Sequence, residues 1–310
     1  MASAHQTARR YKRLNLSAGV LSVVIALILV GLKFWALQRT GALSIAATLA
    51  DSAMDLLVSL GGLLAISYAA RPADKDHAFG HTSAEDLAAL MQALVITGSA
   101  LTIIVSALKR LTTAQAPQLA DEGAGIAVLA VSVVLTLVLV LWQRFVARTT
   151  SNKVVAADSL HYIGDLIPNI GAMAALAVSA FWDLGRIDAV VALLAGLIML
   201  KGAREIGGGA WNALMDKQAD RAVVADIARI TDAFPGILGH HDLKTRVSGS
   251  RMFVYVHVEM DGSQSLDAAH KISAALRRAI VAAHPNAKVM IHKDPVGVEP
   301  HPEDERLQRD

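Results

Sequence analysis

The sequence predicts a six-helix transmembrane bundle followed by a small cytoplasmic α+β domain. Of the 310 residues, 54% are hydrophobic and 18% are charged, which is more apolar than an ordinary soluble domain. The apolar residues crowd into residues 16–208, whereas the rest of the chain reads like a soluble protein. A helix needs about 20 mostly apolar residues to span a bilayer, and the apolar part offers several such stretches in succession.

Six candidate spans follow one another, and turn or charge signals separate them. They cover residues 16–38, 43–70, 84–111, 123–147, 153–182 and 187–208. The first and fourth spans are nearly free of internal charge, so we expect them to face lipid. The second, third and fifth contain polar residues and are expected to face the bundle interior. The first span is too long for a signal peptide and lacks a cleavage pattern, so we expect it to be retained.

Lysines and arginines are unevenly distributed between the two sides of the predicted bundle. One side has Arg9, Arg10, Lys12, Arg13, Arg71, Lys75, Arg144, Arg148, Lys153, Lys201 and Arg204, and the other has Lys33, Arg39, Lys109, Arg110 and Arg186. Cytoplasmic loops are enriched in Lys and Arg, so both termini and the loop 71–81 are predicted to be cytoplasmic. The net charge of +2 and the lack of basic runs interleaved with aromatics argue against a nucleic-acid partner.

The region after residue 212 has the element order α-β-β-α-β. Helical spacing of apolar residues predicts a helix over 219–234, and Ser265 is the predicted N-cap of a second helix over 265–284. Alternating residues predict two strands joined by a turn at Ser248–Ser250, and a last strand over 287–295. The expected domains are therefore 1–212 and 213–295, followed by a disordered tail, 296–310.

Two of the candidate spans carry pairs of ionisable residues four positions apart. Asp51 and Asp55 share one face of the second span, and His161 and Asp165 share one face of the fifth. Three carboxylates and one imidazole suit a divalent cation such as Zn²⁺, and the absence of cysteine excludes thiolate sites. The alternative is that each residue only hydrogen-bonds to a neighbouring helix. Asp158, one turn before His161, is predicted to be a wetted residue near the helix end, with a way station for the ion as the alternative.

Two further groups of possible ligands lie outside the spans. The loop contains Asp74, His77 and His81, with Asp76 as an alternative carboxylate, and a solvated polar loop is the competing interpretation. The C-terminal region contains His240, His241, His257, His270, His284, His292 and Asp294. His292 and Asp294 share one face of a strand, so histidines of several elements could converge on a metal. Ordinary surface histidines are the alternative, and His284 fits it best.

Motifs for other functions are absent from the sequence. It contains no H-E-x-x-H motif of a metalloprotease, no G-x-x-x-x-G-K-[ST] motif for ATP and no G-x-S-x-G motif. The chain is therefore not expected to be an enzyme, and a driven process would have to use an ion gradient.

The spans, the paired motifs and four further segments together resemble a known family. D-x-x-x-D in the second span, H-x-x-x-D in the fifth, and the segments "RPADKDHAFGH", "GHHDLKTR", "YVHVEM" and "MIHKDP" are similar to the cation diffusion facilitators, closest to their bacterial zinc/iron efflux branch, over residues 10–295. The resemblance implies a metallochaperone-like C-terminal domain. It also implies a homodimer in the bacterial inner membrane that exports divalent metal in exchange for protons by alternating access. Zn²⁺ is the expected cargo, with Cd²⁺ beside it.

Two alternatives remain for the function. One is efflux of Fe²⁺, Co²⁺ or Ni²⁺ by the same mechanism, because these ions accept the same ligands. The other is a metal sensor or scaffold anchored in the lipid bilayer without transport, which would need the C-terminal histidines but not the pairs inside the spans.

The resemblance also assigns residues to three metal sites, with zinc both transported and structural. The transport site is Asp51, Asp55, His161 and Asp165, the loop site is Asp74, His77 and His81, and the binuclear site at the dimer interface is His241, His257, His270, His292 and Asp294. One departure concerns the dimer. In the family branch a lysine after the loop pairs with an aspartate early in the C-terminal region, whereas here Ser83 stands at the lysine position and Asp216 at that of the aspartate.

Overall fold

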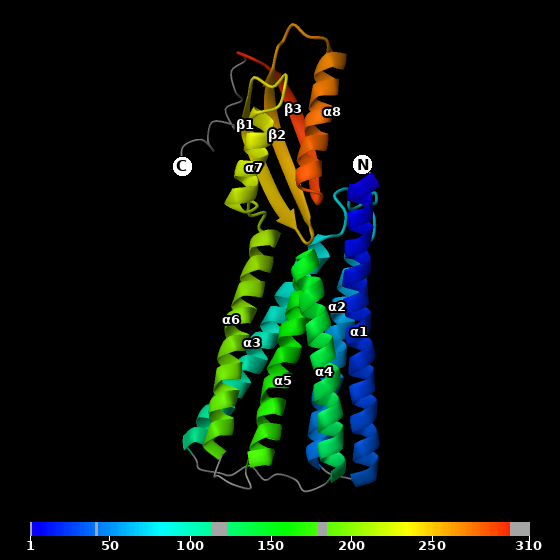
Figure 1. Cartoon of the computed structure of the whole chain (residues 1–310), viewed down its shortest axis with the longest axis vertical. Coiled ribbons are helices and arrows are strands. Elements are labelled where there is room, and N and C mark those ends of the chain that lie inside the picture. Colours follow the sequence, from blue (N-terminus) through cyan, green and yellow to red (C-terminus); the bar gives the residue numbers. More distant parts are fainter. Residues whose placement is uncertain (1, 41–42, 113–122, 179–184, 298–310) are drawn as a thin grey trace. The chain divides into compact units, whose positions relative to one another are not determined.

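The computed structural model describes residues 2–40, 43–112, 123–178 and 185–297 (Figure 1). They form two compact units. One spans Lys12–Trp211, and the other comprises Met1–Tyr11 and Asn212–Asp310. The predicted disordered tail, 296–310, lies from residue 298 onward outside the described residues.

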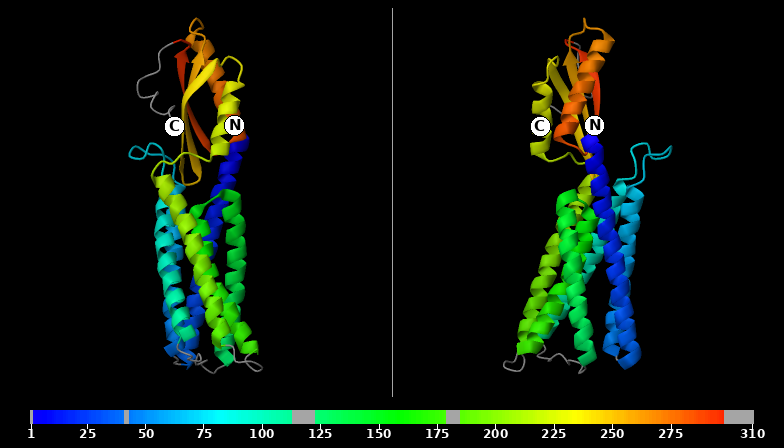
Figure 2. Two further views of the ribbon diagram at one scale, coloured as in Figure 1. Left: turned by 90° about the vertical axis from the view of Figure 1, so that its left-hand side faces the viewer. Right: turned by 45° about the vertical axis from the view of Figure 1, so that its right-hand side comes forward.

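Long helices make up the first unit, and they run side by side in both views of Figure 2. They are α1 (Ala2–Thr40), α2 (Leu43–Ala69), α3 (Ser83–Thr112), α4 (Gly123–Thr150), α5 (Lys153–Val178) and α6 (Gly185–Leu214). Each matches a predicted span, although α1 and α6 extend beyond theirs, and positions 179–182 of the fifth predicted span are outside the described residues.

Four of these helices are long and apolar enough to cross a membrane, counting only the described residues. The qualifying segments are Arg10–Arg39, Asp51–Ala69, Ser83–Lys109 and Ala130–Thr150. The chain therefore contains a helical membrane region, and spans formed by α5 and α6 stay a prediction.

Helix α5 is central in this unit because it contacts α2, α3 and α4. Small residues allow close approach of its neighbour α6: a Cβ atom added at Gly164 would lie 2.2 Å from the Met199 side chain. Ala157 and Met199 belong to one buried cluster with residues of α3. Small residues at helix contacts are typical of membrane bundles, where packing rather than water exclusion holds helices together. This packing fixes the face of α5 that bears the ionisable residues.

The second unit has the predicted order α-β-β-α-β. Its elements are α7 (Arg221–Asp232), β1 (Gly239–Ser248), β2 (Arg251–Met260), α8 (Leu266–Ala283) and β3 (Ala287–Pro295). The strands form one sheet in the order β1-β2-β3, with β1 and β2 antiparallel and β2 and β3 parallel. Gly249, with a φ of 54°, forms the tight turn between β1 and β2. The predicted N-cap is confirmed, since Ser265 Oγ accepts a hydrogen bond from the Ala268 backbone N–H at 3.2 Å.

The two faces of the sheet differ in composition. Figure 2 shows α7 and α8 on the same face, where Val254, Val256 and Val258 of β2 pack with Ile227 of α7 and Leu276 of α8. Because side chains of a strand alternate between faces, the odd-numbered residues of β2 lie on the opposite face. That face is the one that presents histidines.

Candidate metal sites

A group of possible ligands, a buried histidine and two half-buried aspartates, joins α2 and α5 in the helical unit. His161 Nε2 lies 2.9 Å from Asp55 Oδ1, and atoms of Asp55, His161 and Asp165 all lie within 4.8 Å of one another. His161 Nδ1 and one oxygen of Asp165 are buried with no hydrogen-bond partner among the described residues. A buried polar atom without a partner is costly, and a dication or protons would satisfy these atoms. The donor set of two carboxylates and an imidazole suits a borderline cation.

Asp51, the fourth predicted ligand, is not part of this group. It lies one turn before Asp55 on α2 and is exposed. Between the two aspartates Ser52 is buried, and its hydroxyl lies 2.6 Å from the ammonium of Lys33 on α1. Lys33 is within electrostatic range of Asp55, Asp165 and Asp51. The sequence predicts Lys33 to be a loop charge, whereas in the structure Lys33 is half-buried and lies near the group of Asp55 and Asp165.

Asp158 lies near the start of α5, as expected, but it is buried, so the expectation that water wets it was wrong. Its relative exposure is 5%. One oxygen, Oδ2, accepts hydrogen bonds from Ser22 Oγ and from Gln143 Nε2, both at 2.6 Å. The other oxygen has no hydrogen-bond partner among the described residues. These partners belong to α1 and α4, which are distant in sequence, so only the packing of the helices buries Asp158.

The loop between α2 and α3 folds Asp74 between two imidazoles. Asp74 Oδ1 lies 3.2 Å from His77 Nδ1, and Asp74 Oδ2 lies 3.2 Å from His81 Nε2. His81 is buried, its Nδ1 has no hydrogen-bond partner among the described residues, and its ring packs edge-on against Tyr68 at 4.6 Å. Asp76, the alternative carboxylate, only donates its backbone N–H to Asp74. The three predicted loop residues are therefore brought together.

The electrostatics of the loop favour a charged carboxylate. The backbone N–H of His77 donates to Asp74 at 2.7 Å and is the main cause that holds the pKa of Asp74 below its ordinary value, followed by the His77 side chain and the His81 charge. A carboxylate that stays ionised, next to two imidazoles, is a ligand set that a divalent cation can enter without displacing a proton from the carboxylate.

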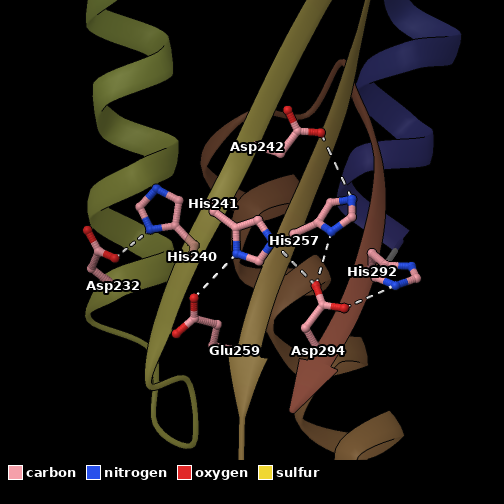
Figure 3. A network of polar contacts seen from close by, with 8 residues as sticks. All are labelled: Asp232, His240, His241, Asp242, His257, Glu259, His292 and Asp294. Carbon is pink, nitrogen blue, oxygen red and sulfur yellow. Dashed lines mark hydrogen bonds and ion pairs between the residues drawn. The ribbon is translucent and has the colours of Figure 1, made fainter. Parts of the chain in front are cut away.

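Histidines of all three strands stand in one row across the open face of the sheet (Figure 3). His241 of β1 is paired in register with His257 of β2, and His257 is paired with His292 of β3. Asp294 of β3 lies among them: its oxygens are 3.0 Å from His257 Nδ1, 3.2 Å from His292 Nε2 and 3.6 Å from His241 Nε2. Atoms of His241, His257 and Asp294 lie within 4.8 Å of one another, which is the spacing of ligands around one ion.

Two carboxylates that the sequence analysis missed flank this row. Glu259 Oε1 lies 3.4 Å from His241 Nδ1, and Asp242 Oδ2 lies 4.0 Å from His257 Nε2. The pairing of β1 with β2 shifts between His241 and Lys244, and Asp242 in this irregularity has a φ of 47°. Glu259 could have been found from its odd position in β2. The bulge that exposes Asp242 to His257 has no signal in the sequence.

The remaining C-terminal histidines lie elsewhere. His270 is exposed on α8, the helix that covers the valine face, so within one chain the sheet separates it from the row. His240 pairs with Asp232 at 2.6 Å, and His284 pairs with Asp226 at 3.0 Å. His241 rather than His240 therefore joins the row.

The two positions of the departure, Ser83 and Asp216, both lie in the described part of the chain. Asp216, the aspartate that the resemblance pairs with a lysine, accepts a hydrogen bond from the Arg246 guanidinium at 2.8 Å within its own unit. This hydrogen bond is the main cause that raises the pKa of Arg246. Ser83 itself lies at the first turn of α3. Asp216 is thus held by an arginine of the same chain.

Two family models match almost the whole chain. The one described as the cation efflux transmembrane domain matches residues 19–215, and the one described as the cytoplasmic domain of cation efflux proteins matches residues 219–296.

Curated relatives match over a similar length. The cation-efflux pump FieF of Serratia proteamaculans is 39% identical over 291 residues, which covers 94% of this chain and 96% of the relative. FieF of Yersinia enterocolitica is 38% identical with the same coverage. Among solved structures, the metal-bound C-terminal domain of the CzcD transporter from Thermotoga maritima is 24% identical, covers 26% of this chain and 100% of that chain, and has a TM-score of 0.25.

Proposed function

Since the chain belongs to the cation efflux family, we propose that it exports Zn²⁺, and also Cd²⁺, from the cytoplasm in exchange for protons. Members of this family are membrane transporters of metal cations and not enzymes. The observation that supports this proposal most is the group of Asp55, His161 and Asp165, in which a buried histidine and two half-buried carboxylates meet between α2 and α5 of a membrane helix unit. Ionisable residues at such depth usually mark a transport pathway.

The chemistry of this group accounts for both the cargo and the counter-ion. The carboxylates of Asp55 and Asp165 offset the desolvation of a dication, and Asp51, one turn away on α2, supplies a further carboxylate as the fourth ligand. An imidazole nitrogen binds either a proton or a metal ion, so protons and metal compete for His161. Metal leaves as protons enter, and an inward proton gradient therefore drives efflux through a site that opens alternately to the two sides.

The six long helices are proposed to span the bacterial inner membrane, with α5 and α6 as the two spans that complete the bundle. The excess of Lys and Arg on the side of both termini supports a cytoplasmic location for the termini and for the C-terminal domain. All-helical spans satisfy their backbone hydrogen bonds internally, as the bilayer requires.

The cytoplasmic domain is proposed to hold structural zinc and to join two copies of the chain. His241, His257, His292 and Asp294 supply the ligands of one chain, and His270, which lies apart from them, completes a binuclear site at the interface of a homodimer. Asp294 would serve as a ligand shared within this site, since its two oxygens contact different imidazoles. The loop site of Asp74, His77 and His81 is a third position for a divalent ion.

The chemistry of the ligands indicates which cation the protein exports. An imidazole among carboxylates favours Zn²⁺, with Cd²⁺ close behind, and a set of oxygens alone would favour Mn²⁺. Fe²⁺, Co²⁺ and Ni²⁺ accept the same ligands, so efflux of these ions by the same mechanism is the second candidate. A membrane-anchored sensor or scaffold is the third, favoured only by the fact that the histidine row lies in a unit of its own.

Reconstitution separates these candidates. The purified chain is placed in liposomes that contain a zinc-sensitive dye, and a pH gradient is imposed before Zn²⁺, Cd²⁺, Fe²⁺ or Mn²⁺ is added outside. We expect zinc flux that follows the gradient and stops when an ionophore collapses it. A scaffold would show no flux of any metal, and flux that ignores the ionophore would refute proton coupling.

A further inference from the structure

Asp158 lies at the end of a network of hydrogen-bonded hydroxyl groups that connects α1, α2 and α5. Ser22 Oγ lies 2.6 Å from Asp158 Oδ2, Ser59 Oγ lies 2.8 Å from Ser22 Oγ, and Tyr162 Oη lies 3.0 Å from Ser59 Oγ. Ser22, Ser59 and Tyr162 are each at most 1% exposed. Buried polar networks of this kind are expensive unless every member is satisfied.

The number of hydroxyl protons determines which group donates and which accepts in each hydrogen bond of this network. Each hydroxyl has a single proton to donate. Ser22 donates its proton to Asp158, so Ser59 must donate to Ser22, and Tyr162 must donate to Ser59. The Gln143 amide donates to the same oxygen of Asp158. Oδ2 therefore accepts two hydrogen bonds, and a proton held by this carboxyl group must sit on Oδ1.

Oδ1 of Asp158 is the oxygen that the hydrogen bonds of this network leave unoccupied. It is buried with no hydrogen-bond partner among the described residues, and so is Gln143 Oε1. Asp158, Gln143 and Ser59 line a small cavity together with apolar residues of α1, α2 and α5. The centre of a water molecule has about 10 Å³ in which to move there, close to the least that one water needs. A water in this cavity would accept from a protonated Oδ1 and donate to Gln143 Oε1.

The charges around Asp158 change when a metal binds. No cationic Lys or Arg lies within ion-pair distance of Asp158 among the described residues, and an unpaired ionised carboxylate is costly at this burial. The titratable groups that act on Asp158 are His161 and Tyr162 of α5 and Asp55 of α2, and its hydrogen-bond donors among the described residues are Ser22 of α1 and Gln143 of α4. His161 and Asp55 belong to the transport group, so a dication there would add positive charge about one helical turn from Asp158.

We propose that Asp158 is a second proton-holding site, which carries a proton on Oδ1 in the metal-free protein and releases it to water when Zn²⁺ occupies the neighbouring group. The O–H bond of the carboxyl group breaks, the electron pair stays on Oδ1, and the proton passes to a water molecule, which becomes hydronium. The donors Ser22 and Gln143 stabilise the carboxylate that remains. This inference rests on the proposed exchange of zinc for protons and adds one proton to it.

Proton release on zinc binding at equilibrium tests the inference without a flux assay. The full chain in detergent and weak buffer is titrated with Zn²⁺, and a pH dye reports the protons released per ion bound. Asp158→Asn keeps the size of the side chain and resembles the protonated acid. We expect this variant to bind Zn²⁺ and to release about one proton fewer than the wild type. Asp232→Asn, which removes a carboxylate of the C-terminal domain outside the proposed metal groups, should release the wild-type number.

A second variant and a second readout make the test decisive. Ser22→Ala keeps the carboxyl group but removes a donor to its ionised form, so the pH at which the extra proton is released should rise. In infrared difference spectra, zinc should remove a carboxylic C=O band in the wild type, and Ser22→Ala should shift this band. An unchanged proton count in Asp158→Asn would overturn the inference. If Asp158→Asn binds no zinc, the wild-type infrared spectrum decides. A wild-type spectrum in which zinc removes no carboxylic C=O band would overturn the inference about Asp158, while leaving the proposed exchange of zinc for protons intact.

Discussion

Replacing Asp294 by asparagine is expected to abolish most of the zinc-dependent stability of the C-terminal domain. The oxygens of Asp294 contact imidazoles of all three strands, at 3.0, 3.2 and 3.6 Å. Asparagine has nearly the same size but no negative charge, so it can keep one polar contact while losing the ability to neutralise a dication. The change should therefore act on the metal-bound state far more than on the metal-free state.

The magnitude follows from these contacts. Without metal, the side chains of Asp294, His257 and His292 are 23%, 27% and 64% exposed, and pairs of this kind are worth about 0–1 kcal/mol. With Zn²⁺ at 100 times its dissociation constant, the wild type gains about 2.7 kcal/mol. If the variant binds 100-fold more weakly, the same zinc concentration gives it about 0.4 kcal/mol. The difference corresponds to roughly 10–18 °C in Tm for a domain of this size.

Thermal unfolding of the fragment 213–310 measures this difference, since that fragment contains the sheet, both helices and their hydrophobic core. Melting curves are recorded with a chelator and with saturating zinc for the wild type and for Asp294→Asn. Asp232→Asn is the matched control, because it also removes a carboxylate from a histidine, His240, at a contact of 2.6 Å outside the row. The control should keep the full zinc shift.

If zinc raises Tm equally in the wild type and in Asp294→Asn, Asp294 is not a ligand of the metal. A wild-type fragment that melts at the same temperature with zinc and with chelator would refute the reasoning as well. In that case the row of histidines would be a surface feature and not a metal site.

Three further predictions concern other parts of the chain. His161→Asp should lower discrimination against Mn²⁺, because it replaces the imidazole by a harder oxygen ligand; competition between Zn²⁺ and Mn²⁺ in flux assays measures this, and an unchanged preference would speak against the ligand role. Lys33→Met should tighten Zn²⁺ binding, because the charge of Lys33 acts on Asp55 and Asp165 and opposes that of a dication bound between them; titration against a zinc-chelating dye should show it, and weaker binding would contradict it. The hydrogen bond from Arg229 is the main cause that lowers the pKa of Asp226, so its stabilisation is present above the unfolded pKa near 4 and is lost as pH falls through the lower folded pKa. Asp226→Asn should therefore flatten the fall of Tm between about pH 5 and 3, and an acid limb identical to that of the wild type would exclude this contribution.

Local patterns were sufficient to predict the elements of the fold. The apolar runs mark the long helices, and the alternation in "RMFVYVHVEM" predicts both the strand β2 and the face on which His257 lies. The N-cap at Ser265 follows from the residue type alone. These features depend on neighbours in sequence, which is why a single sequence contains them.

Long-range packing decided what the sequence could not predict. Asp158 reads as an end-of-helix residue, yet Ser22 and Gln143, which lie 136 and 15 positions away, surround it. The backbone irregularity at Asp242 and the pairing of Asp216 with Arg246 likewise depend on how segments meet. The i, i+4 spacing placed Asp51 and Asp55 on one helix face, but it could not indicate that only Asp55 contacts His161 in this conformation.

The most direct test of the account is to record zinc and pH inside the same proteoliposomes, for the wild type and for Asp55→Asn. Asp55 makes the 2.9 Å contact with His161, and asparagine keeps its shape without its charge. The account predicts that in the wild type zinc enters as protons leave, and that in Asp55→Asn both movements stop together. Coupled exchange at the wild-type rate in Asp55→Asn, or zinc movement with no change of internal pH in the wild type, would contradict it.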